Sequence, residues 1–353
     1  MAVLIFILIL LVLVVGHEAG HFVAAKLARM KVLEFGVGFP PRIWGRRVGE
    51  TEYTVNWIPF GGFVRILGED EKDADDPDAF SRKHPVEQAF VLAAGPGANI
   101  LFGIMLSIVA LVAGMPSIID GTDDVARARD LSVIVSEVIP ESPAADAGVR
   151  AGDRVLSIMT PEALAQMVAE SDGPVTLRVR RGGEEFSVLM TPEPGIVSDD
   201  PDRKAVGVAT ALIGTISLPL NEAVVVGTLN AMQNLVAIAV AILTLIGNAV
   251  SLSADLSQVA GPVGIAALTG EAATFGLGSL LSFAAMLSLN LAIINLLPFP
   301  ALDGGRLFFL GIETAVRRRL PAAVFQTANA VGFVLLILLM LAVTVQDISR
   351  LIG

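Results

Sequence analysis

Two histidines and a glutamate stand together in the string His17-Glu18-Ala19-Gly20-His21 near the start of the chain. On a helix, positions i and i+4 lie about 40° apart around the axis, so both imidazoles can face one metal ion. Glu18 lies beside them and can polarise a water molecule on the same ion. With three histidines in 353 residues, chance placement produces this pattern on the order of once in a thousand such chains. The alternative is a buried polar pair, but such side chains at the end of an apolar stretch are costly to bury unless paired or coordinated. The string therefore predicts zinc (Zn2+) ligation by His17 and His21.

A catalytic zinc usually takes three protein ligands and keeps one position open for water. The chain has no cysteine, and its third histidine, His84, lies in a polar stretch where a surface position is expected. The remaining candidate type is a carboxylate. Asp303 directly follows an apolar stretch, in Asn295-Leu-Leu-Pro-Phe-Pro-Ala-Leu-Asp-Gly-Gly305. The prolines break a helix there and the glycines allow close backbone approach. A turn or helix-capping aspartate is the alternative, but beside the histidine pair a third ligand is the preferred interpretation.

The composition places these residues in a membrane protein. Hydrophobic residues make up 54% and charged residues 17% of the chain, against roughly 45–50% and 25% in soluble proteins. The mean hydropathy is +0.72. A disordered chain and an ordinary soluble enzyme are excluded, and a polytopic α-helical membrane protein remains. The net charge of −11 argues against nucleic-acid binding.

Four windows are apolar over the length of about 20 residues that a spanning helix needs, namely 1–27, 89–115, 277–297 and 328–345. We interpret the first as a retained span rather than a signal peptide, because it has no basic start and no small-residue cleavage site. A fifth window, 223–250, is apolar enough to span but carries several amides. Lys and Arg concentrate in 25–87 and 303–325, which predicts that these segments are cytoplasmic. The segment 116–222 is then extracytoplasmic.

Two stretches between the spans have strand patterns. Residues 33–67 alternate and are rich in glycine, which predicts a small sheet at the membrane surface. Residues 131–193 contain a strand-like run at 131–139, a helical pattern at 161–170, and strands at 175–180 and 185–190 around a Gly-Gly turn. Pro, Gly and Asp punctuate this stretch as in a small β-rich domain. The acidic run 69–78 is expected to be a solvated loop.

The string Ser142-Pro-Ala-Ala-Asp-Ala-Gly-Val-Arg-Ala-Gly-Asp-Arg-Val-Leu-Ser-Ile158 resembles a PDZ domain of the bacterial protease type. Such domains often bind an extended peptide by adding a strand to a sheet edge. This copy lacks the usual Asn-Gly turn after Ile158 and has no clear Gly-rich carboxylate loop. A peptide partner at the PDZ domain and a purely steric role both remain open.

The H-E-x-G-H string, the later N-x-x-P-x-P-x-L-D-G-G and a PDZ insertion between them resemble the site-2 protease family (M50) over essentially the whole chain. The nearest type is the single-PDZ bacterial regulator of sigma-E protease (RseP-like) intramembrane zinc metalloprotease. The resemblance implies that His17, His21 and Asp303 are zinc ligands and that Glu18 is the general base.

The resemblance also carries over substrate-binding and packing residues. It implies that Asn295 holds substrate backbone, for which a helix-terminus cap is the alternative. It matches Gly95-x-x-x-Asn99 to a close-packing motif, which plain helix packing explains equally well. The edge formed by Gly61, Gly62, Phe63 and Val64 matches a membrane-embedded β-loop that pairs with an unwound substrate, and Gly38-Phe39-Pro40 belongs to the same sheet.

The topology bears on the fifth window. Asp303 and the two histidines must lie at one depth, on the cytoplasmic side. A single extra crossing at 223–250 would put Asp303 on the wrong side, so an interfacial or re-entrant helix is expected, followed by a family-like segment at 257–265. The predicted organisation is a first transmembrane helix (1–28), a membrane-associated β region with an acidic loop (29–87), a second transmembrane helix (88–115), an extracytoplasmic PDZ domain (116–200), a linker with interfacial helices (201–275), a third transmembrane helix (276–298), the Leu-Asp-Gly segment with a cytoplasmic loop (299–327) and a fourth transmembrane helix (328–353).

The function implied is peptide-bond hydrolysis within a bacterial inner membrane. The expected substrates are transmembrane segments of pre-trimmed single-span proteins, such as anti-sigma factors, and remnant signal peptides. Two alternatives belong to other classes. A membrane scaffold or receptor with a PDZ domain would hold a structural metal. A metal transporter would need ionisable residues at several depths, whereas the spans here are almost free of charge apart from Glu18.

Overall fold

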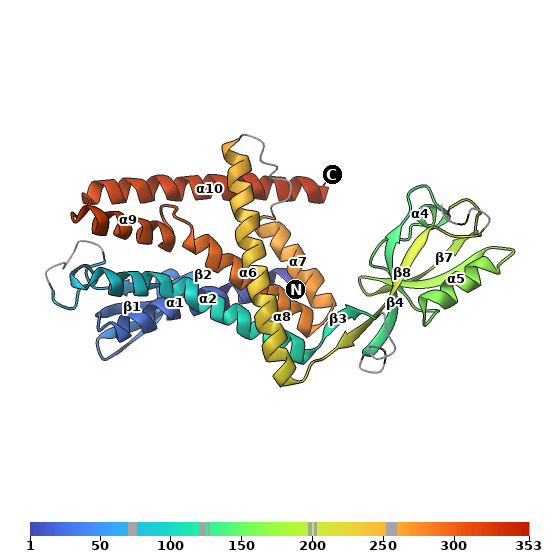
Figure 1. The fold of residues 1–353 in the computed structure, drawn as a ribbon, viewed down its shortest axis with the longest axis horizontal. Coiled ribbons are helices and arrows are strands. Elements are labelled where there is room, and N and C mark those ends of the chain that lie inside the picture. The colour runs from blue at the N-terminus through green and yellow to red at the C-terminus, as the bar shows by residue number, and fades with distance from the viewer. Residues whose placement is uncertain are drawn as a thin grey trace. The chain divides into compact units, whose positions relative to one another are not determined.

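The computed structural model describes residues 1–69, 76–119, 125, 128–196, 200, 203–251 and 260–352. The chain forms two compact units. A helical unit comprises Met1–Val109, Asn221–Ala273 and Leu280–Gly353, and a β-rich unit comprises Ala110–Leu220 and Thr274–Ser279 (Figure 1).

Within the described residues, five helices are long and apolar enough to cross a membrane. These are α1 (Ala2–Leu27), α2 (Pro85–Ala113), α6 (Leu220–Val250), α8 (Leu277–Leu296) and α10 (Ala322–Ile352). Four of them coincide with the predicted windows. The helix α10 extends beyond the window 328–345 at both ends, because Gln326 and Asp347 lower the hydropathy there without ending the helix.

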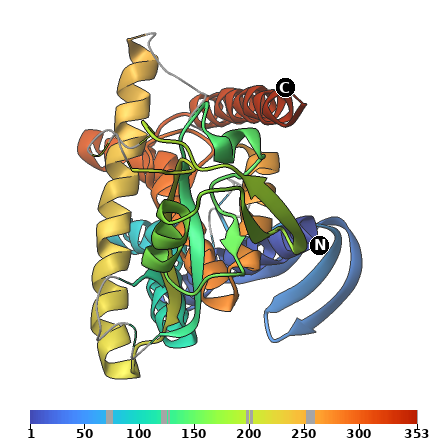
Figure 2. The same cartoon turned by 90° about the vertical axis from the view of Figure 1, so that its right-hand side faces the viewer.

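The ambiguous window 223–250 forms the single helix α6. The length and composition of α6 would allow it to span a membrane. The topology argument from the sequence predicts an interfacial or re-entrant helix instead. In both views α6 is steeply inclined to α10, and Figure 2 shows the two helices apart from each other (Figures 1 and 2). It approaches α2 closely at Gly227, where an added Cβ would lie 2.9 Å from Cγ1 of Ile108.

The described part of the helical unit also contains two shorter helices. The helix α9 (Asp303–Val316) occupies a segment that we expected to be a loop, and its amphipathic sequence explains why a search for uniformly apolar windows misses it. The helix α7 (Pro262–Thr274) begins against α10, where the buried Asp347 accepts hydrogen bonds from the backbone N–H groups of Gly261 and Gly264. Of the family-like segment 257–265, residues 257–259 lie outside the described part of the chain.

The predicted small sheet is the hairpin of β1 (Val32–Val48) and β2 (Thr51–Ile66). Both strands bend, so that Glu34 pairs with Arg65 on one side and with Glu52 on the other. The register gives the lateral order 62–66, 32–37, 51–56, 42–48, which leaves the stretch with Gly62 and Val64 at one end. Figure 2 shows the hairpin as a curved ribbon projecting from the helices. The short 3-10 helix η1 (Phe80–Arg82) precedes α2. Of the predicted acidic loop, residues 70–75 lie outside the described part.

The β-rich unit contains a six-stranded sheet in the order β3-β8-β4-β5-β6-β7. Its strands are β3 (Met115–Ile118), β4 (Arg129–Val138), β5 (Arg154–Val155), β6 (Val175–Arg181), β7 (Glu184–Met190) and β8 (Val208–Ile216). Among the described residues of this unit, two helices, α4 (Pro143–Asp146) and α5 (Pro161–Ala169), accompany the sheet. The predicted strands and the predicted helix at 161–170 are confirmed.

Strand β8 corrects the predicted domain boundary. We placed residues 201–275 in a linker with interfacial helices, but β8 pairs with both β3 and β4 in the sheet. The unit therefore extends to Leu220 instead of ending at residue 200. An apolar strand that runs almost directly into the apolar α6 gives no break in hydropathy, and this explains the error.

A cleft of about 380 Å³ lies in the β-rich unit between α5 and β8. Leu164 and Val168 of α5 line one wall, and Val208 and Thr210 of β8 line the other. Arg203 and Lys204 add basic side chains to the lining, and Glu137 adds an acidic one. The cleft therefore has apolar walls with two basic positions and one acidic position.

A buried ion pair stabilises the β-rich unit and supplies its clearest stability prediction. Arg181 Nε and Nη2 lie 2.7 and 2.6 Å from the two carboxylate oxygens of Asp153, whose side chain is 1% exposed. Burial alone would raise the pKa of Asp153, but the hydrogen bonds from Arg181 outweigh it and hold that pKa below its usual range. The ion pair therefore stabilises the folded unit at pH values above the ordinary carboxylate pKa of about 4. This stabilisation is lost as the pH falls through the lower pKa that Asp153 has in the folded state.

Asp153→Ala should destabilise the unit by about 2 kcal/mol, less than the roughly 3–5 kcal/mol of a fully buried pair because Arg181 is partly exposed. Hydrogen exchange of β6 and β7 in the full chain at neutral pH should then accelerate about thirtyfold. Asp172→Ala is the matched control, because Asp172 pairs with Lys204 at 2.8 Å but is 99% exposed. Equal exchange rates in the two variants would contradict the prediction.

Candidate active site

The histidine string lies where α1 packs tightly on α2. An added Cβ at Gly20 would lie 2.4 Å from the backbone oxygen of Ala94 and 2.7 Å from Cβ of Ala98, so a side chain there would force the helices apart. This close approach brings His17 and His21, one helical turn apart on α1, against α2. His17 is buried, and the side chain of His21 is 12% exposed.

Gly95 of α2 makes the space that the two rings occupy. An added Cβ at this position would lie 2.2 Å from Nε2 of His21 and 2.8 Å from Cε1 of His17. The Gly95-x-x-x-Asn99 motif therefore does more than allow plain helix packing. Its glycine leaves room for the imidazoles, and its asparagine contacts one of them, with Nδ2 lying 3.2 Å from Nδ1 of His17.

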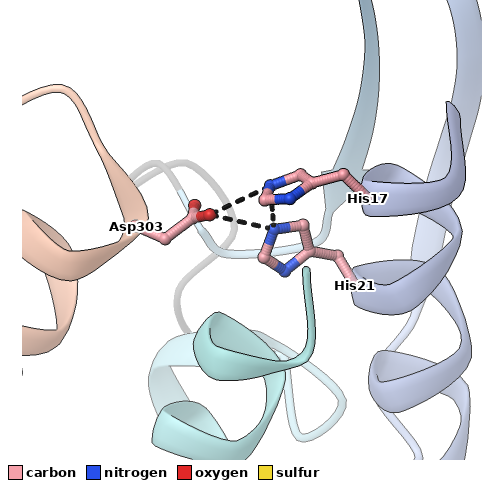
Figure 3. Close-up of side chains that lie close together, drawn as sticks. All are labelled: His17, His21 and Asp303. Atoms are coloured by element: carbon pink, nitrogen blue, oxygen red, sulfur yellow. Dashed lines mark hydrogen bonds and ion pairs between the residues drawn. The ribbon is translucent and has the colours of Figure 1, made fainter. Parts of the chain in front are cut away.

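Asp303 approaches from the opposite side, at the first turn of α9 (Figure 3). The chain reverses sharply between α8 and α9, and Gly304 and Gly305 permit this reversal. An added Cβ at either glycine would lie 2.2 Å from a backbone oxygen of the preceding turn. Close backbone packing thus sets the position of the Asp303 carboxylate.

Three ligand atoms converge in this way. Oδ2 of Asp303 lies 3.0 Å from Nε2 of His17 and 3.3 Å from Nε2 of His21, and the two ring nitrogens are 3.1 Å apart. Burial alone would raise the pKa of Asp303, but the two imidazoles outweigh it and hold that pKa well below its usual range. The carboxylate is therefore ionised at neutral pH.

The arrangement fits a zinc ion. With Zn–N bonds of about 2.0–2.1 Å, neighbouring ligand atoms of a tetrahedron lie about 3.3 Å apart, close to the three observed separations. Two imidazoles and one carboxylate are a donor set found at catalytic zinc sites, where the fourth position is left to water or substrate.

Glu18 lies beside this group and against the hairpin. An added Cβ at Gly62 would lie 3.2 Å from Cγ of Glu18, and the backbone of Val64 lies near the Glu18 carboxylate. Phe63 stacks on Phe39 with a centroid distance of 6.4 Å. Gly61 has a φ of +107°, which favours glycine. The four residues predicted to contact substrate thus form a strand segment adjoining Glu18.

Two other sequence-predicted residues are not members of the three-residue group. Asn295 is half-buried in the last turn of α8, and the group that could hold a metal does not include it. His84 is exposed just before α2, as predicted.

One ion pair near the site was not predicted. Arg306, one turn after Asp303 on α9, pairs with Glu69, which follows β2. Its guanidinium also lies 6.0 Å from the ring centroids of Phe80 and Phe325. The pair joins α9 to the chain that leaves the hairpin. Its partners are 237 positions apart, so spacing along the sequence gave no signal.

A helical protein with several candidate spans, and with two histidines and an aspartate of suitable geometry beside a glutamate, belongs to the class of membrane-embedded metal-dependent hydrolases. The model of "Peptidase family M50" matches residues 5–339, and the chain belongs to this family of zinc-dependent proteases. The predicted resemblance to site-2 proteases is confirmed at the level of the family, as are the predictions of an enzyme and of zinc. The scaffold and transporter alternatives are not supported.

Similar proteins cover nearly the whole chain. The protein named "Putative zinc metalloprotease CPE1693" of Clostridium perfringens is 35% identical over 95% of both chains. "Zinc metalloprotease RasP" of Geobacillus kaustophilus is 29% identical over 98% of this chain and 97% of its own. "Membrane metalloprotease ARASP, chloroplastic" of Arabidopsis thaliana is 31% identical over 97% of this chain and 77% of its own.

Proposed function

We propose that this protein is an intramembrane site-2 protease that hydrolyses a peptide bond within the transmembrane segment of a single-span protein already trimmed outside the membrane. The observation that carries the proposal is the convergence of His17, His21 and Asp303 next to Glu18 and the hairpin edge. A metal with a merely structural role would not need an acid and a peptide-binding edge beside it.

The proposed roles follow from the geometry. His17, His21 and Asp303 hold the zinc ion. When bound, zinc supplies Lewis-acid chemistry, since it polarises a carbonyl oxygen and makes water acidic enough to lose a proton near neutral pH. Glu18 accepts the proton of the attacking water as general base and later delivers it to the leaving amine.

A transmembrane substrate must unwind before this chemistry, because a helix hides its peptide bonds in hydrogen bonds between residues i and i−4. We assign the unwound strand to the edge at Gly61, Gly62, Phe63 and Val64, where strand addition replaces the lost hydrogen bonds. The contact of Gly62 and Val64 with Glu18 supports this assignment, because a strand added there would pass close to the general base. Asn295 is the further proposed contact to substrate backbone.

The membrane arrangement is part of the proposal. The protein lies in the bacterial inner membrane, with the active site toward the cytoplasm and the β-rich unit outside. Lys and Arg are concentrated in 25–87 and 303–325, which supports this orientation. The steep inclination of α6 to α10 supports an interfacial α6 beside four spans (Figure 1). Anti-sigma-factor-like proteins and remnant signal peptides are the proposed substrates, and their cleavage is a step of regulated intramembrane proteolysis.

The β-rich unit is proposed to be a single PDZ domain that excludes untrimmed substrates by their bulk. Its strand and helix order follows the sequence pattern on which the PDZ resemblance was based. The cleft between α5 and β8 is the proposed place for a peptide partner. Two basic residues in its lining, Arg203 and Lys204, against the single acidic Glu137 suit a carboxylate.

The test measures zinc content together with cleavage. The wild-type chain, His17→Ala and Asp303→Asn are reconstituted in lipid vesicles with a single-span protein whose extracytoplasmic part has been removed. We expect about one zinc per chain and cleavage within the transmembrane segment for the wild type, and loss of both in the two variants. Cleavage by either variant at the wild-type rate would overturn the proposal.

A further inference from the structure

The two proposed zinc-binding imidazoles have different kinds of hydrogen-bond partner on α2 at their Nδ1 atoms. Nδ1 of His21 lies 2.8 Å from the backbone oxygen of Val91, which can only accept a hydrogen bond. His21 therefore carries its proton on Nδ1, and Nε2 is free to bind a cation. Nδ1 of His17 faces a side-chain amide instead, that of Asn99, which can either donate or accept.

The orientation of the Asn99 amide decides the tautomer of His17. In the structure Nδ2 faces the ring at 3.2 Å. A donor there requires Nδ1 to accept, so the proton of the neutral ring is on Nε2, which lies 3.0 Å from Oδ2 of Asp303. Nε2 cannot bind a cation in this tautomer. Cation binding requires the proton on Nδ1 and an acceptor facing it, which is Oδ1 after a half-turn of the amide.

The surroundings of Asn99 allow this half-turn. The residue is fully buried, and its backbone oxygen, not its side chain, accepts the hydrogen bond from Oγ of Ser288 at 2.8 Å. Its Oδ1 atom is buried and has no hydrogen-bond partner among the described residues. Turning the amide therefore breaks no other hydrogen bond of that oxygen. The contact with His17 is what offsets the cost of burying an amide in an apolar helix.

We propose that Asn99 is a positioning residue whose amide turns between two orientations, with Nδ2 toward His17 in the metal-free site and Oδ1 toward His17 when Nε2 of His17 binds zinc. The inference rests on the proposed role of His17 as a ligand. It gives Asn99 a function that close helix packing alone does not require.

The test compares substitutions that distinguish the effect of a hydrogen-bond acceptor at position 99 from the effect of side-chain size. Asn99→Asp keeps the shape and presents only acceptors to Nδ1 of His17, whereas Asn99→Leu keeps similar bulk without any hydrogen bond. Ser288→Ala is the matched control, because it removes the hydrogen bond to the Asn99 backbone in the same buried cluster and leaves the amide intact. Zinc affinity of the full chain in detergent is measured by competition with a chelator, with helicity as the check on folding.

Asn99→Leu should bind zinc about 10- to 100-fold more weakly than wild type, the usual cost of losing a group that orients a ligand. Asn99→Asp should bind at least as tightly as wild type, and Ser288→Ala should match it. Equal losses in Asn99→Asp and Asn99→Leu would overturn the proposal, as would wild-type affinity in Asn99→Leu.

A spectroscopic measurement keeps the proposal testable if a variant folds poorly. In the metal-free chain labelled with ¹⁵N-histidine, the His17 proton should be on Nε2 in the wild type and on Nδ1 in Asn99→Asp. The same proton position in both would overturn the proposal. His17→Ala distinguishes a failure of the proposed zinc ligand set from a failure of the proposed role of Asn99. Wild-type zinc affinity in His17→Ala would refute the proposed ligand set, whereas a loss there without one in Asn99→Leu would refute only the role of Asn99.

Discussion

Glu18→Gln should keep its zinc and lose nearly all proteolytic activity. The amide has the shape of the carboxylate, so the close contact with Gly62 is preserved. It cannot accept a proton from water at neutral pH. Because general-base catalysis typically contributes 10²–10⁴-fold, we expect cleavage to fall by roughly that factor. Single-turnover cleavage in reconstituted vesicles measures it, with zinc content determined on the same sample.

A nearby carboxylate supplies the control for Glu18. Glu69 is half-buried and lies close enough to interact electrostatically with Glu18, but it pairs with Arg306 instead of adjoining the proposed ligands. Glu69→Gln should lower cleavage far less than Glu18→Gln. A Glu18→Gln chain that keeps its zinc and cleaves within threefold of wild type would show that Glu18 is not the general base.

The part of the site that could be predicted is the part encoded by local spacing. His17 and His21 share a helix, so their separation of four positions was enough to place both rings on one face. Asp303 could be selected because cysteine is absent and a third histidine is not at hand, and because few acids follow an apolar stretch directly. The structure brings these three side chains together over a separation that no local pattern encodes.

What the sequence did not reveal depends on contacts between distant elements. The space that Gly95 leaves for the imidazoles, the amide of Asn99 behind His17 and the pairing of Arg306 with Glu69 all join residues far apart in the chain. A small residue in an apolar helix looks the same whether it faces lipid, a packed helix or a ligand. Only the crossing of α1 and α2 distinguishes these cases.

The fold likewise contains elements that the local sequence predicts and one that depends on contacts with distant strands. The hairpin β1–β2 and the strands β6 and β7 were predicted because turns and alternation mark them. Strand β8 was missed because its place in the sheet depends on partners in β3 and β4, while its own sequence merges into an apolar helix. Uniformly high hydropathy therefore predicts the long helices well. It does not reveal strand β8, because no polar segment marks a boundary between β8 and α6.

Gly95→Ala should abolish the metal site. Its methyl carbon would lie 2.2 Å from Nε2 of His21, a proposed ligand atom, and 2.8 Å from Cε1 of His17. The close packing of α1 on α2 at Gly20 leaves the rings little room to retreat without parting the helices. We expect a loss of zinc affinity beyond the roughly 100-fold upper range for losing a group that orients a ligand, together with loss of cleavage.

Gly97→Ala is the control for this substitution. Gly97 lies two residues further along α2, and an added Cβ there meets nothing within 4 Å. In each case alanine gains about 1 kcal/mol of helix propensity over glycine, so the two variants differ in the clash and not in their effect on the helix. Gly97→Ala should therefore be at least as stable as wild type, with unchanged zinc affinity by chelator competition and unchanged cleavage. Equal zinc affinity in the Gly95 and Gly97 variants would mean that the imidazoles can give way, and that the shape of α2 does not define the metal site.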